Sequence, residues 1–168
     1  MCGIKYIKAG VMFPVIEEML KEGRSVRITV TGSSMYPFLR ENIDSIELSS
    51  SNFINIHRGD IVLILRDTGA YILHRILKKE KDRFYIVGDH QQWIEGPLRQ
   101  DQLIAVAIAI WRKDKKIVCT NIWWKILSRA WLRLLPVRHV VLVLYHQYIG
   151  LRDRVHRLKS LLVKKGEG

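Results

Sequence analysis

The residues that decide the fold are 61–77, with the sequence IVLILRDTGAYILHRIL. An apolar run over Ile61–Leu65 is separated by the turn-forming residues Asp-Thr-Gly from a second run over Ala70–Leu77. Two such runs around a turn predict a pair of antiparallel strands. Successive side chains of a strand point to opposite faces, so His74 shares its face with the isoleucines two residues before and after it. The sequence thus predicts a histidine with apolar neighbours.

Further strand candidates lie on both sides of this hairpin. They are short, alternating or apolar, and bounded by turn residues. They span residues 24–31, 43–48, 84–87, 103–111 and 117–119. These runs predict a mainly β domain of about six or seven short strands over residues 24–119.

The two ends of the chain have helical rather than alternating periodicity. Apolar residues with helical spacing follow Pro14, and Gly23 is suited to end that helix, which predicts an N-terminal helical lead-in over residues 1–23. After residue 120, Trp123, Leu127 and Trp131 recur every four residues, with lysine and arginine on another face. We therefore expect a basic amphipathic helical tail over residues 120–168, interrupted near Pro136.

The positive charge of the chain is confined to its C-terminal third. The net charge is +12 over 168 residues. Residues 1–111 hold 14 lysines and arginines against 13 acidic residues, whereas residues 112–168 hold 14 against 3. The β domain is therefore nearly neutral, and the tail carries the charge that would attract an anionic partner.

The sequence favours a cytoplasmic protein or one peripheral on the cytoplasmic membrane. Its two cysteines, Cys2 and Cys119, form no CxxC pair, so neither a disulfide framework nor zinc-ligand spacing is indicated. The N-terminus lacks the apolar core of a secretory signal, and no uninterrupted apolar run is long enough for a conventional transmembrane helix. We expect no cofactor and no metal.

Four short motifs stand in a fixed order along the predicted β domain. They are Gly-Ser-Ser-Met-Tyr-Pro at residues 32–37, Arg-Gly-Asp at 58–60, His-Arg at 74–75 and Gly-Asp at 88–89. Between about residues 27 and 110, this order resembles the signal peptidase I and LexA-like serine peptidase superfamily. The histidine at position 74 is similar to the endoplasmic reticulum and archaeal type, because the bacterial type has lysine there.

The resemblance implies a LexA/signal-peptidase-like β domain with serine peptidase activity toward signal or leader peptides. Ser34 matches the nucleophile and His74 the general base. A serine hydroxyl is a weak nucleophile until a base takes its proton. An apolar surround favours the neutral imidazole that can accept it. The alternative for His74 is a core histidine that bonds a backbone group.

The acid that would orient His74 is left open by the sequence. Asp89 matches the aspartate of the family's Gly-Asp motif, while the further acid of histidine-type members falls on Glu95, where the family has aspartate. Asp89 could instead be a turn residue and Glu95 a surface carboxylate. Gly32 replaces the serine that assists the oxyanion in bacterial enzymes, so backbone N–H groups, including that of Ser34, would serve instead. Ser33 is expected to be structural.

The basic tail has three interpretations. Tryptophans beside lysines and arginines favour an anionic membrane surface. The same helices could simply pack on the β domain with a solvated charged face. Binding to nucleic-acid phosphates is the least favoured interpretation, because the clustered tryptophans suit a membrane interface or a core.

Two alternative functions are considered beside cleavage of precursor peptides. The first is LexA-like self-cleavage, for which Ala9-Gly10 and Cys2-Gly3 resemble the dipeptide that is cut. The second is a non-catalytic module that binds a membrane or a partner on a decayed peptidase scaffold, motivated by the departures at Gly32 and Glu95.

Overall fold

The computed structural model describes residues 9–166, and the side chains of residues 12–154 except 146 and 153. The chain divides after Leu132 into two compact units. The first contains one helix, the whole β-sheet and nearly all of a second helix. The second contains the remaining helical segments.

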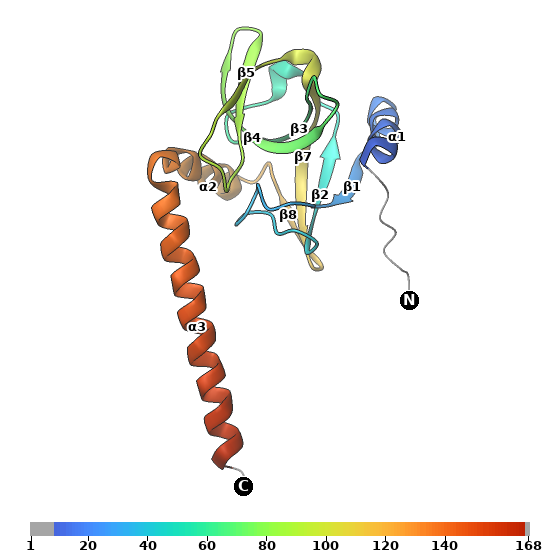
Figure 1. Ribbon diagram of the computed structural model, residues 1–168. Helices are drawn as coiled ribbons and strands as arrows, with labels where there is room; N and C mark the ends of the chain where they lie inside the picture. The colour runs from blue at the N-terminus through green and yellow to red at the C-terminus, as the bar shows by residue number, and fades with distance from the viewer. Residues whose placement is uncertain (1–8, 167–168) are drawn as a thin grey trace. The chain divides into compact units, whose positions relative to one another are not determined.

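The first unit is built on an eight-stranded antiparallel sheet (Figure 1). In chain order its elements are α1 (Ala9–Lys21), β1 (Val26–Thr29), β2 (Asp44–Ser49), β3 (Ile61–Leu65), β4 (Tyr71–Glu80), β5 (Arg83–Val87), β6 (Glu95–Arg99), β7 (Leu103–Arg112), β8 (Lys115–Val118) and α2 (Ile122–Arg133), with short 3-10 helices η1 (Phe53–Asn55) and η2 (Gln100–Gln102). The strand order is β1-β2-β7-β3-β4-β5-β6, with β8 paired to β7.

The predicted fold class is confirmed: the protein is mainly β, with an N-terminal helix and C-terminal helices. The strand count is eight rather than six or seven. The missed strand is β6, which begins at Glu95 and contains Gly96 and Pro97. These residues are typical of a loop, but β6 lies at an edge of the sheet, where a proline that cannot donate a hydrogen bond is tolerated.

β3 is the centre of the core because both of its faces are buried. Ile61 and Leu63 join one apolar cluster, and Val62 and Ile64 join the other. The alternation predicted for β4 is confirmed in the same way. Tyr71 packs against the first cluster, whereas its neighbours on the opposite face of the strand pack against the second. Because β3 is buried on both faces, it has no exposed polar side, and this explains the continuous apolar run in its sequence.

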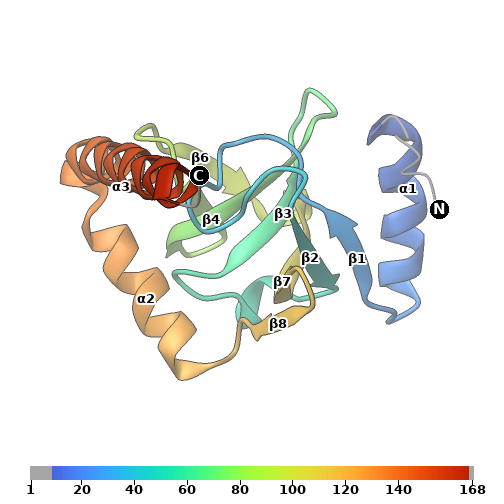
Figure 2. The ribbon, with the colours of Figure 1, turned by 90° about the horizontal axis from the view of Figure 1, so that it is seen from below.

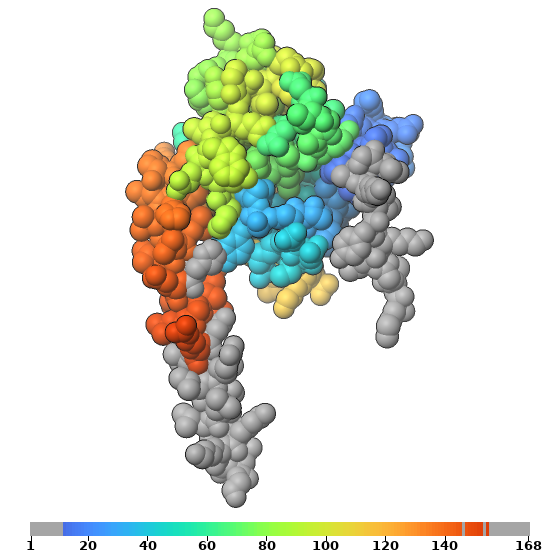
Figure 3. All heavy atoms as spheres, viewed as in Figure 1, coloured from blue at the N-terminus to red at the C-terminus, as the bar shows by residue number. Residues whose placement is uncertain are grey.

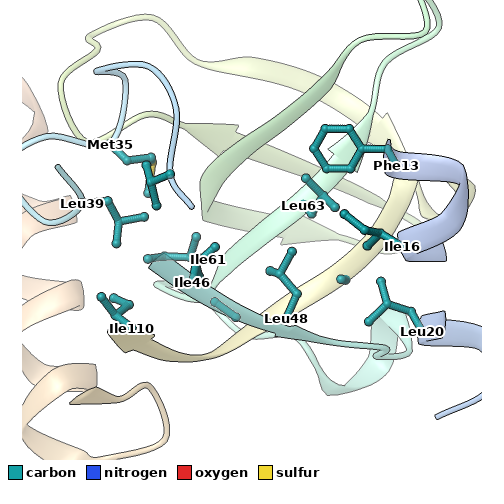
Figure 4. Close-up of a cluster of buried hydrophobic side chains, with 13 residues drawn as sticks. Phe13, Ile16, Leu20, Met35, Leu39, Ile46, Leu48, Ile61, Leu63 and Ile110 are labelled. Atoms are coloured by element: carbon teal, nitrogen blue, oxygen red, sulfur yellow. The ribbon is translucent and has the colours of Figure 1, made fainter. Parts of the chain in front are cut away.

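α1 and the segment after β1 close the first cluster from different sides. Figure 4 shows Phe13, Ile16 and Leu20 extending from α1 toward the sheet, while Met35 and Leu39 enter the same cluster from the segment after β1. Ile16, Leu20, Met35 and Leu39 are each less than 5% exposed. The turn that carries the two serines is thus anchored in the core by the residue directly after Ser34.

α2 packs on the side of the sheet opposite α1 (Figure 2). Its Trp124 and Trp131 contact the ring of Phe38 at centroid distances of 5.6 and 5.3 Å. Because of such contacts, the first compact unit extends to Leu132. The domain boundary expected at residue 120 stays a prediction.

The second unit begins with η3 (Leu135–Val137), which contains Pro136, and continues as α3 (Arg138–Gly166). The break expected near Pro136 therefore separates α2 from α3. Across the described residues, no helix combines the length and apolar character needed to span a membrane.

Candidate functional site

The turn that carries Ser34 is shaped by Gly32. Gly32 has a φ of +80°, in the left-handed region that side chains rarely adopt, and its N–H donates to a carboxylate oxygen of Glu41 at 2.8 Å. The backbone conformation therefore favours glycine at this position. Ser33 is exposed and Ser34 is half-buried. In the part of the chain that the structure describes, the Ser34 N–H donates to no protein group.

Ser34 lies on the wall of an apolar groove of about 260 Å³. The groove is lined by Val30, which directly follows β1, by Leu63 of β3 and by Leu73 of β4, and α1 contributes Phe13. The Phe13 ring stacks on the ring of Tyr71, another lining residue, at a centroid distance of 4.2 Å. The groove therefore presents Ser34 at the side of an apolar channel that α1 partly covers.

The loop after β5 connects Ser34 to the strand that carries His74. The Ser34 carbonyl accepts a hydrogen bond from the His90 N–H at 2.8 Å, and a Cβ on Gly88 would lie only 2.8 Å from that carbonyl. β4 and β5 pair Arg75 with Val87, so one further step of the same register brings Gly88 opposite His74. Figure 3 shows the yellow-green segment between β5 and β6 lying against the blue segment that follows β1. Gly88 thus bridges the predicted nucleophile and the predicted base.

His74 is 3% exposed, and its environment favours the neutral imidazole. Burial lowers the pKa of His74 below its ordinary value. The negative charges of Glu95 and Asp89 oppose this shift, while the positive charge of Arg66 reinforces it. The buried Nδ1 of His74 has no hydrogen-bond partner, and no hydrogen bond among the described residues joins its ring to the Ser34 hydroxyl.

Asp89 is committed to Arg75 rather than to His74. Both residues are fully buried, and the pair is bidentate, with Arg75 Nε and Nη2 donating to the two carboxylate oxygens at 2.9 and 2.7 Å. The remaining Arg75 Nη1 donates to the Gly59 carbonyl at 2.7 Å and to the Ser128 hydroxyl at 2.8 Å. Arg75, with Asp89 as its counter-charge, therefore joins β4 to the loop after β5, to the turn before β3 and to α2.

Glu95, at the start of β6, forms a bidentate pair with Arg66 at the end of β3. The two N–O distances are 2.6 and 2.5 Å. Of the charges that act on the pKa of His74, that of Glu95 has the largest effect. Neither acid is hydrogen-bonded to His74 among the described residues. The structure thus separates their positions: Asp89 belongs to a buried ion pair, and Glu95 lies in a charged pair that acts on His74 through space.

Sequence reasoning missed three partners of these residues. Arg75 follows the predicted base directly, and the only signal in the sequence was that His-Arg and Gly-Asp occur together among the motifs. Arg66 and Ser128 offered no such signal, because they lie 29 and 53 residues along the chain from the groups they contact. Only the folded sheet and the docking of α2 bring these groups together.

No group of metal-binding side chains is found among the described residues. A comparison with protein-family models finds no match for the chain, and a comparison with curated proteins finds none either.

The two acids are expected to differ sharply in their contribution to stability. Asp89→Asn should lower the free energy of unfolding by roughly 3–5 kcal/mol, because it leaves the fully buried Arg75 guanidinium without its counter-charge. Glu95→Gln should cost less than about 1 kcal/mol, because the Arg66–Glu95 pair is partly exposed. Urea unfolding measures both values. Equal losses for the two variants would contradict this assignment.

Proposed function

We propose that the protein is a serine endopeptidase in which Ser34 is the nucleophile and His74 the general base. One observation carries this proposal: Ser34 faces an apolar groove and touches Gly88, whose register position is opposite a buried histidine with a lowered pKa. A groove of this kind suits an extended peptide beside the hydroxyl. The absence of a hydrogen bond between the two side chains does not exclude the pair, since such bonds often tighten only with substrate bound.

In the proposed reaction, the Ser34 oxygen attacks the carbonyl carbon of the scissile peptide bond while His74 takes the hydroxyl proton. The resulting oxyanion accepts a hydrogen bond from the Ser34 N–H, which has no other acceptor among the described residues. The C–N bond then breaks as His74 returns the proton to the leaving amine, and an acyl-enzyme remains. Water hydrolyses this ester by the reverse proton route, releasing the acid and restoring Ser34.

Glu95 is the acid that we assign to His74 in this scheme. Its negative charge stabilises the imidazolium that forms when His74 accepts a proton, and it has the largest effect of any single charge on that group. The carboxylate of Asp89 is occupied by Arg75, so Asp89 acts as a positioning residue. The sequence left open whether Asp89 or Glu95 orients His74, and these contacts support Glu95.

The substrate class follows from the motif resemblance to signal peptidase I and LexA-like enzymes. That resemblance implies precursor peptides bound in extended form, with small side chains before the scissile bond. The glutamate at position 95 and the glycine at position 32 depart from the family pattern, and they also motivate the alternative of a non-catalytic scaffold.

Self-cleavage is a second candidate because α1 itself lines the groove. Met12 and Phe13 share the groove with Ser34, and Ala9-Gly10 precedes them by two residues. Ala9-Gly10 is helical here, so it would have to unwind to bind as an extended strand. The other candidate dipeptide, Cys2-Gly3, lies outside the described residues.

We further propose that residues 120–168 hold the enzyme at an anionic membrane surface. On α2, Ile122, Trp123 and Leu127 are more than half exposed, beside a row of cations spaced four residues apart. On α3, considered by itself, the exposed apolar residues include Val140 and Leu144. Apolar and cationic side chains on the outer surface of a helix are typical of interfacial binding.

Replacing the nucleophile should abolish cleavage. Ser34→Ala should reduce kcat/KM for a leader peptide by about 10³-fold or more. Ser33→Ala is the matched control and should retain activity, because Ser33 is exposed in the same turn. Intact-mass measurement of the same incubations reports any self-cleavage. Equal cleavage by wild type and Ser34→Ala protein would overturn the proposal, and labelling of Ser34 by a serine-directed inhibitor would exclude the non-catalytic alternative.

The pH dependence should reflect the buried base. Because His74 must be neutral to act and its pKa is lowered, the acid limb of kcat/KM should have its midpoint below pH ~6.5. Glu95→Gln should move this midpoint further down, since it removes a charge that raises the pKa and leaves Arg66 unpaired. Glu80→Gln, an exposed substitution of the same kind, should leave it unchanged. A midpoint above 6.5, or an upward shift in Glu95→Gln, would contradict the assignment.

Membrane association should depend on the tryptophan that α2 exposes. Trp123→Ala should weaken binding to vesicles containing phosphatidylglycerol several-fold, because the indole is 75% exposed and available to the interface. Trp93→Ala is the control, since Trp93 is also largely exposed but lies between β5 and β6. Sedimentation with vesicles measures both. Equal losses in the two variants would contradict a specific role for the tail.

A further inference from the structure

A second hollow lies between the turn before β3 and the part of α2 that packs against this turn. It has a volume of about 160 Å³, far more than the roughly 15 Å³ that one water needs. The turn contributes residues 57–60, and α2 contributes Trp124, Lys125, Ser128 and Arg129. All of these residues belong to the first compact unit.

The lining of this hollow is strongly cationic. Arg58, Lys125 and Arg129 surround it, with Asp60 as the single carboxylate, so the lining carries a net charge of +2 with His57 neutral. No ion pair between described residues engages any of the three cations. The Asp60 carboxylate accepts the backbone N–H of His57 at 2.8 Å and is thus directed into its own turn. Three cations around one cavity repel one another, and an anion between them would relieve this repulsion.

The floor of the hollow is formed by close contacts between the turn and α2. A Cβ on Gly59 would lie 3.4 Å from the Ser128 Cβ, so the turn and the helix are already in close contact there. The Gly59 N–H donates to the Ile76 carbonyl at 2.9 Å, and the Gly59 carbonyl accepts from the buried Arg75. A preformed floor between cations from two elements is what an anion site needs, since little ordering is required when the ligand binds.

The cation arrangement suits a phosphate group. Arginine presents a planar fork that pairs with two oxygens of one group, and lysine supplies a compact charge. Arg58 approaches from the turn, whereas Lys125 and Arg129 approach from successive turns of the helix. Donors from separate directions match a tetrahedral group with several oxygens better than a planar carboxylate.

We propose that this hollow, defined by Arg58, Lys125 and Arg129 and here called the cationic pocket, binds a single phosphate group. The group could belong to the headgroup of an anionic lipid or to a small soluble phosphate. The site is independent of Ser34 and of the groove, so it does not rest on the proposed peptidase activity.

The test uses the full chain with Ser34→Ala as background and with inorganic phosphate as the first probe. At constant ionic strength, phosphate should cause saturable shifts of the Gly59 and Ser128 amide resonances. Lys125→Gln combined with Arg129→Gln should weaken this binding at least tenfold. The matched control, Lys21→Gln combined with Lys115→Gln, removes the same charge from exposed positions on α1 and β8 and should leave binding unchanged. The dispersion of the amide spectrum verifies that each variant is folded.

Vesicles distinguish the two sources of phosphate. If the source is a lipid, binding to vesicles of phosphatidic acid in phosphatidylcholine should fall more in the pocket variant than in the control variant, and inorganic phosphate should compete. If the source is a soluble phosphate, the two variants should lose vesicle binding equally while only the pocket variant loses phosphate binding. Absence of saturable shifts at Gly59 and Ser128, or equal shifts in the pocket variant and the wild type, would overturn the proposal.

Discussion

The buried pair of Arg75 and Asp89 is the interaction on which the rest of the structure depends. A fully buried guanidinium is tolerated only when its charge is balanced and its donors are satisfied. Arg75 meets both conditions with four hydrogen bonds, two to Asp89, one to Gly59 and one to Ser128. Its guanidinium also lies 5.0 Å from the centre of the Phe38 ring. Segments that are far apart in the sequence therefore all contact the guanidinium of Arg75.

This pair also fixes the geometry of the proposed active site. His74 and Arg75 are adjacent in β4 and point to opposite faces, so anchoring the arginine limits how far the strand can rotate and holds the histidine on the other face. Asp89 follows Gly88, which contacts the backbone of Ser34. The Arg75–Asp89 pair thus helps to position both the turn that carries Ser34 and the strand that carries His74. Neither the Ser34 nor the His74 side chain takes part in the ion pair.

The charged groups on the two faces of β4 differ in their exposure to solvent. On the face of His74, Glu95 and Arg66 form a partly exposed pair whose fields oppose each other at the imidazole. On the face of Arg75, the charges are buried and balanced, and the Gly59 turn continues outward to the cationic pocket. A ligand in that pocket would touch the same turn and helix that hold Arg75. The cationic pocket would thus be linked to the buried Arg75 through the Gly59 turn and α2, without any contact to the groove beside Ser34.

The sequence by itself determined the mainly β class, most of the strands and the apolar neighbours of His74 on its strand. These features are local, because the periodicity of apolar residues and the conformational preferences of turn residues extend over only a few positions. The sequence did not determine β6, because its glycine and proline are typical of a loop. It also did not determine which carboxylate pairs with which arginine. Asp89 meets Arg75 across 14 residues, and Glu95 meets Arg66 across 29. Such pairings depend on sheet register and on the docking of α2, and only the tertiary structure decides them.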